Sequence, residues 1–171
     1  IDDAHRDRHP PKIEEFEEHT LVLYRGIAAF DAELNFVPQQ VAFFIAERYL
    51  ISLHPGPARS IDRLFGNGGV ELLRRSPEQV ALKAMFHSAG FYLDSLLEFE
   101  NQLSDLEDGL VGGGGDELMR QLSGYRSRLV KMRRVFNYHL GITEELTTSD
   151  YSHLPREVSE TLYAINDVHE R

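Results

Sequence analysis

The sequence contains no cysteine and no long apolar run, and each absence excludes a class of structure or site. Without cysteine there are no disulfides or thiolate metal sites, so any metal would be held by oxygen or imidazole. The longest purely apolar run is Val41 to Ala46, whereas a membrane-spanning helix needs roughly 18 apolar residues or more. Basic residues are outnumbered, 18 against 28 acids, which gives a net charge of −10. This charge argues against nucleic acid as a partner and is compatible with cations.

What is present is enough for one folded domain. The chain has 171 residues with 42% hydrophobic content, which supports one core and is too short for two ordinary domains. The first residue is isoleucine, and a helical pattern continues to Arg171. We therefore expect a soluble piece of a longer protein.

The first part of the chain, residues 1–75, has the composition of a β-sheet. Three segments are rich in β-branched and aromatic residues, namely Thr20 to Ile27, Phe36 to Ile45 and Tyr49 to Leu53. The last two are so close in sequence that they predict an antiparallel hairpin, and Pro38 suits a sheet edge or a strand start. We expect a meander of about three strands, completed by strands before residue 1.

Residues 76–140 predict a pair of long helices. Ser76 and Pro77 form a helix start, and apolar residues then recur at helical spacing until Gly112 to Gly115. A second helix begins near Asp116, and Pro155 begins a third that continues to the end of the chain. Residues 95–108 carry five acids and no base, whereas residues 120–134 carry six bases and no acid. We therefore expect an antiparallel helical hairpin in which these two stretches face each other.

Histidines and aspartates crowd the first residues. His5 and His9 are spaced i, i+4, which would place two imidazoles on one helical face for zinc, but Pro10-Pro11 ends any helix there. Asp2-Asp3 taken alone is more typical of a surface or a helix cap. Near the end of the second helix, His139 is expected to interact with the negative end of the helix dipole.

Several short motifs follow one another in a fixed order. They are Asp2-Asp3, Pro11-Lys12-Ile13-Glu14 with Phe16, the strand Leu21-Val22-Leu23, Tyr49 to His54, Ser76-Pro77, Leu106-Glu107-Asp108, Arg133-Arg134, and Asp167-Val168. This order resembles the cytoplasmic domain of the CorA-type magnesium transporter family over nearly the whole chain. Pro10 departs from the pattern, because arginine is usual there.

The resemblance implies an α+β fold: a mixed or antiparallel sheet flanked by helices, with a long antiparallel helical hairpin and, at 155–171, the start of a stalk helix. It also implies a homopentamer at the cytoplasmic face of the cell (inner) membrane, without enzymatic activity or catalytic residues. Divalent cations at the subunit interfaces would favour the closed state. By the match of motifs, Asp2, Asp3 and Asp167 are the implied ligands of Mg2+, with Zn2+, Co2+ or Ni2+ as alternative ions.

Two other functions stay open at this point. The zinc-transporting ZntB branch shares this architecture, and Arg25-Gly26 after the first strand resembles that branch. Alternatively, the chain is a stand-alone acidic interaction module whose helical hairpin docks a protein.

Overall fold

A computed structural model describes residues 10–31, 33–111, 115–154 and 167. Within them four strands come first, namely β1 (Lys12–Glu15), β2 (Thr20–Phe30), β3 (Phe36–Ile45) and β4 (Leu50–Leu53). Helices then follow, namely α2 (Arg59–Gly66), α3 (Gly69–Arg75), α4 (Pro77–Val111) and α5 (Asp116–Thr148). The α+β class predicted from the sequence is confirmed, and the third helix predicted from Pro155 lies outside the described residues.

The strands form one antiparallel meander in the order β1-β2-β3-β4. Strand β1 pairs with β2. It was not predicted, because three of its four residues are charged (Lys12, Glu14 and Glu15) and it therefore lacks the alternation of apolar and polar residues that indicates a strand. Pro38 pairs with Ile27, whereas β4 reaches only from Ala42 to Ile45 of β3. Among the described residues, no second strand therefore pairs with β3 at Pro38, and such an edge position is where a sheet tolerates proline.

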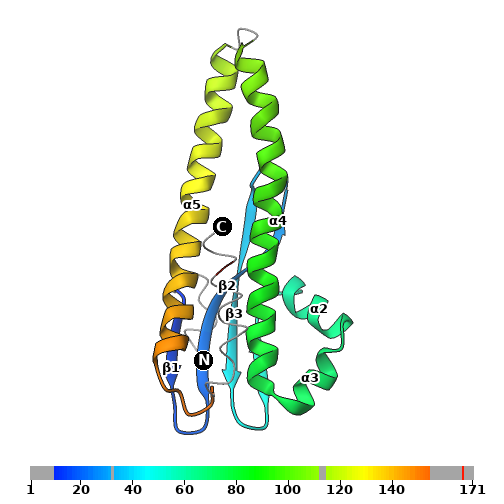
Figure 1. The fold of residues 1–171 in the computed structure, drawn as a ribbon, viewed down its shortest axis with the longest axis vertical. Coiled ribbons are helices and arrows are strands. Elements are labelled where there is room, and N and C mark those ends of the chain that lie inside the picture. Colours follow the sequence, from blue (N-terminus) through cyan, green and yellow to red (C-terminus); the bar gives the residue numbers. More distant parts are fainter. Residues whose placement is uncertain (1–9, 32, 112–114, 155–166, 168–171) are drawn as a thin grey trace.

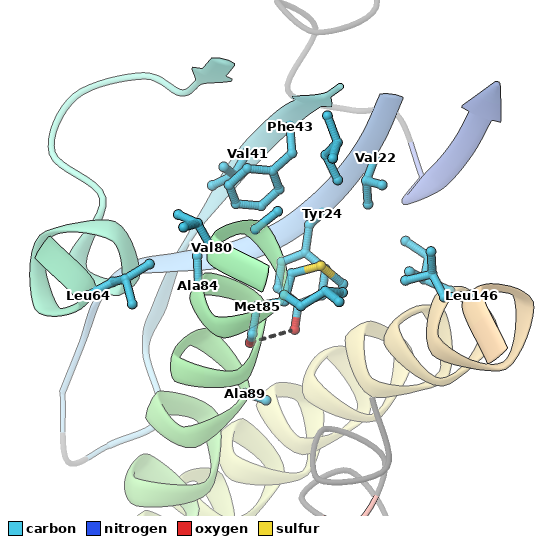
Figure 2. Packing of buried hydrophobic residues seen from close by; sticks show 14 residues of the cluster. Val22, Tyr24, Val41, Phe43, Leu64, Val80, Ala84, Met85, Ala89 and Leu146 are labelled. Atoms are coloured by element: carbon cyan, nitrogen blue, oxygen red, sulfur yellow. Dashed lines mark hydrogen bonds between the residues drawn. The ribbon is translucent and has the colours of Figure 1, made fainter. Parts of the chain in front are cut away.

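The core lies between one face of this sheet and the two long helices. Val22, Tyr24, Val41 and Phe43 project from β2 and β3 into a cluster that α4 covers (Figure 2), and Ile45 belongs to the same cluster. The facing residues of α4 are mostly small, so its backbone comes close to the sheet; they include Val80, Ala81, Ala84, Met85 and Ala89. Helix α5 closes the same cluster with Ile142 and Leu146. Burying each large apolar side chain contributes about 1.5–3 kcal/mol.

Two short helices precede α4 and were not predicted. The segment Gly66-Asn67-Gly68-Gly69 joins them. Gly68 has a φ of +87°, a left-handed conformation that glycine adopts without strain. At Gly69 a Cβ atom would lie 2.9 Å from the carbonyl oxygen of Leu64, so only glycine lets α2 and α3 approach this closely.

The two long helices form the predicted antiparallel hairpin. Helix α4 begins as expected, because the Ser76 hydroxyl accepts a hydrogen bond from the backbone N–H of Gln79 at 3.3 Å. Helices α4 and α5 then run side by side along the long axis of the molecule, and their distal ends extend beyond the sheet (Figure 1). Phe99 of α4 and Tyr125 of α5 join the projecting part through an edge-to-face ring contact of 4.8 Å.

Candidate functional site

The carboxylates implied as metal ligands fall largely outside the described residues. Asp2 and Asp3 lie in 1–9, as do His5 and His9, so the structure says nothing of them. Asp167 is described: the residue is helical and is exposed to solvent. An exposed carboxylate is a hard oxygen ligand of the kind that Mg2+ accepts. The proposed grouping of these three aspartates therefore stays a prediction.

The described part of the chain offers no alternative metal centre. Among residues 10–31, 33–111, 115–154 and 167, no three histidine, aspartate or glutamate side chains lie close enough together to hold an ion. No helix in this part of the chain has the length and apolar character needed to cross a membrane.

The segment that follows α5 contacts the end of strand β1. The backbone N–H of Ser152 donates a hydrogen bond of 2.8 Å to the Glu15 carboxylate. This hydrogen bond lowers the pKa of Glu15. Burial and the neighbouring Glu145 raise the pKa of Tyr151 to about 12. The part of the chain just before 155–166 therefore contacts the end of β1 through Ser152 and Glu15.

A buried junction of rings joins the sheet to both helices, and it includes His139. This histidine is fully buried and stacks on Tyr24 of β2 with 4.1 Å between ring centroids. The Tyr24 hydroxyl donates to the Met85 carbonyl at 3.4 Å, as Figure 2 shows, and its oxygen lies 3.3 Å from Nδ1 of His139. Burial raises the pKa of Tyr24 well above its ordinary value, so the hydroxyl remains a donor.

The prediction that His139 interacts with the end of the helix dipole was therefore wrong. Helix α5 continues to Thr148, so His139 lies more than two turns before its end. The sequence did contain a signal for this placement, because the apolar stripe of α5 does not stop at Phe136. It continues at helical spacing through His139, Ile142 and Leu146, all of which are buried.

Tyr92 is the other ring of this junction and ties α4 to β2. It is almost fully buried, and its hydroxyl donates to the carbonyl of Gly26 at 3.3 Å. Its ring contacts Phe136 edge-on at 5.5 Å and His139 at 5.7 Å. Both contacts are in the range of favourable aromatic pairs, so one residue holds three elements together.

The acidic and basic stretches of the hairpin do not form direct ion pairs. Within the described residues, no salt bridge joins 95–108 to 120–134. Instead, Arg128 Nη1 donates a 2.5 Å hydrogen bond to the Glu33 carbonyl and lies 3.8 Å from the Glu33 carboxylate. The contact between the helices is therefore made by rings, and Arg128 belongs to a contact with the β2–β3 loop.

Beside this contact lies a cleft of about 320 Å3. It lies between α5 and the start of β3, and Tyr92 of α4 forms part of its lining. Its lining is mainly apolar, with two cations from α5; the residues are Leu34, Asn35, Phe36, Pro38, Tyr92, Arg128, Lys131, Met132 and Val135. From the sequence, Arg128 and Lys131 were expected to face the acidic stretch of the other helix. The cleft was not predicted, because its lining residues come from three segments that are distant in sequence.

Comparisons with known proteins agree with this architecture. A family model described as "CorA-like Mg2+ transporter protein" matches residues 1–171. The soluble domain of CorA from Methanocaldococcus jannaschii is similar in structure with a TM-score of 0.75 at 20% identity, over 98% of this chain and 70% of that one. The full-length CmaX protein has the same TM-score and identity, over 97% of this chain.

A third similar structure belongs to another branch. The ZntB cytoplasmic domain from Vibrio parahaemolyticus has a TM-score of 0.59 at 14% identity, over 99% of this chain and 70% of that one. At such identities the likeness shows the fold. The chain spans 51% of CmaX, and no curated protein sequence matches it.

Proposed function

Because the chain belongs to the CorA-like Mg2+ transporter family, we propose that it is the cytoplasmic, ion-sensing domain of a divalent-cation channel or transporter. The observation that carries this proposal is the family match over residues 1–171. The shared fold of the CorA soluble domain supports it. The proposed role is regulatory and not enzymatic, and the proposed location is the cytoplasmic face of the cell membrane.

The ion would be bound where subunits meet. Asp2 and Asp3 of one subunit and Asp167 of its neighbour are the proposed ligands in a homopentamer of the full-length protein. Mg2+ keeps much of its water shell and is commonly held by one or two carboxylates, so such a sparse site suits it. Its weak binding would match an abundant cytosolic ion.

The same carboxylates supply a regulatory mechanism. When the ion leaves, negative charges of neighbouring subunits face each other without compensation, and their repulsion disfavours the closed assembly. The ion therefore binds the closed state better than the open one, which is the condition for a ligand to shift such an equilibrium. The net charge of −10 adds to this repulsion.

A zinc transporter is the alternative within the same fold. The similarity to the ZntB cytoplasmic domain favours keeping it, and the histidines at 5, 9 and 169 lie close in sequence to the proposed carboxylates. Imidazole suits Zn2+, Co2+ and Ni2+ better than Mg2+. Uptake of Mg2+ and Zn2+ by cells producing the full-length protein would separate the two. Transport of neither ion would favour the stand-alone interaction module.

The proposed site is tested in the full-length protein by limited proteolysis over a Mg2+ titration. Asp3→Asn and Asp167→Asn should each raise the Mg2+ concentration that gives half-maximal protection about fivefold or more, as for a typical coupling between sites. Asp94→Asn is the matched control, because Asp94 is an exposed aspartate in the middle of α4. If the double variant is protected like the control, the ligand assignment is wrong.

A further inference from the structure

The cleft between α5 and the start of β3 has the composition of a ligand site. Most of its wall is carbon, supplied by Phe36, Tyr92, Met132 and Val135, and its charged residues are Arg128 and Lys131. Among the residues that the structure describes, no acid contributes to its lining, although the chain as a whole is strongly acidic. Apolar walls with a few convergent polar groups are typical of sites for small molecules.

The size of the cleft sets the size of the ligand. Its volume of about 320 Å3 lies at the lower end of the range for ligand pockets. Since a water molecule occupies about 30 Å3 of liquid, the cleft has room for about ten non-hydrogen atoms. This volume suits a small molecule and is too small for a folded peptide segment.

The two cations differ in how far they are already compensated. Arg128 is held by the backbone carbonyl of Glu33 and lies near its carboxylate, so its position is fixed and its charge is partly balanced. Lys131 is exposed, and within the described residues it forms no salt bridge. The positive charge available to a ligand therefore comes mainly from Lys131, one helical turn from Arg128.

The wall formed by the β2–β3 loop is built before any ligand arrives. The Asp31 carboxylate accepts hydrogen bonds from the backbone N–H groups of Glu33 and Asn35, both at 3.0 Å, and from the Asn35 amide at 2.9 Å. Leu34 has a φ of +60°, which is unusual for a leucine, and its side chain is fully buried. Beside it, the Tyr92 ring contacts Phe36 with 5.8 Å between ring centroids and is held by the hydrogen bond from its hydroxyl to the Gly26 carbonyl. A preformed site loses little entropy on binding.

We propose that this cleft binds a small amphipathic carboxylate. The apolar part of the ligand packs against Phe36, Tyr92 and Met132, and its carboxylate faces Lys131 with Arg128 behind it. Charge complementarity selects an anion, and the carbon walls select a body of short alkyl or aromatic carbon. This binding is independent of the ion site proposed above.

Calorimetric titration of the 171-residue chain with octanoate tests the proposal. We expect a Kd on the order of 1 mM, which corresponds to about ten atoms at modest efficiency. Neutral 1-octanol and cationic octylammonium should bind more weakly. Lys131→Met should weaken octanoate binding about three- to fivefold, the size of an exposed ion pair. Lys83→Met, which removes an exposed lysine of α4 outside the cleft, should leave binding unchanged.

Several results would overturn the proposal. They are an absence of heat at the solubility limit of octanoate, equal binding of octanol, and equal affinities in the two lysine variants. Val135→Phe fills the cleft from α5 and should abolish binding, with circular dichroism and melting as checks on folding. If the variants change the sedimentation coefficient and not octanoate binding, the cleft is an interface between copies of the chain.

Discussion

Replacing Tyr92 tests whether ring packing holds the hairpin on the sheet. The hydroxyl lies 3.3 Å from the carbonyl of Gly26 and 3.5 Å from that of Arg25, distances that are long for a hydroxyl donor. Tyr92→Phe should therefore cost only about 0.5–1 kcal/mol of unfolding free energy. Tyr92→Leu also removes the ring contacts with Phe36, Phe136 and His139.

For Tyr92→Leu we expect a loss of about 2–4 kcal/mol, below the 3–5 kcal/mol typical of replacing a buried aromatic residue with alanine. In a chain of this size, about 3 kcal/mol lowers the melting temperature by about 6–12 °C. Urea unfolding followed by circular dichroism measures both variants. A double-mutant cycle with Phe136→Leu should give a coupling of about 0.5–1.5 kcal/mol. Equal costs for the Phe and Leu variants would refute the reasoning, because the hydroxyl would then carry the stability.

Two further predictions concern the β2–β3 loop and the assembly. Hydrogen bonds from Asn35 lower the pKa of Asp31 from its ordinary value of 3.8. The carboxylate therefore stabilises the fold above that ordinary pKa, and this contribution is lost as the pH falls through the lower pKa of the folded state. Asp31→Ala should flatten the fall of the melting temperature below the ordinary pKa, and an unchanged profile would contradict the assignment. In sedimentation without divalent ions, the 171-residue chain should be a monomer or weak oligomer, because its net charge of −10 opposes association at low salt. A tight pentamer under these conditions would show that the contacts within this part of the protein suffice.

The parts of the fold that could be predicted are those with a strong local pattern. Ser76-Pro77 and the glycines after Val111 marked the ends of α4, and the β-branched run from Phe36 to Ile45 gave β3 its observed bounds. Strand β1 and helices α2 and α3 were missed, because four residues or two turns carry too little periodicity. Their partners follow directly along the chain, β2 for β1 and α4 for the two short helices.

The candidate sites divide in the same way. The order of motifs identified the family, because it extends over the whole chain. The placement of His139 in the core and the cleft beside Arg128 needed the structure, since each is made by three separate segments. The expected ion pairs between the helices failed for a physical reason: rings such as Phe99 and Tyr125 occupy the seam, and the charged groups of both stretches are left mainly in solvent.

The anchoring of α4 and α5 at Tyr92 makes the projecting hairpin a lever arm. From Tyr92 to Val111 the helix rises about 28 Å at 1.5 Å per residue, and the far end of α4 extends beyond the sheet (Figure 1). A tilt of about 5° at the anchor would therefore move the far end by about 2.5 Å. Packed interfaces tend to change between discrete arrangements, so a side-chain rearrangement too small to disturb the sheet would be amplified into a displacement large enough to make or break a contact at the tip.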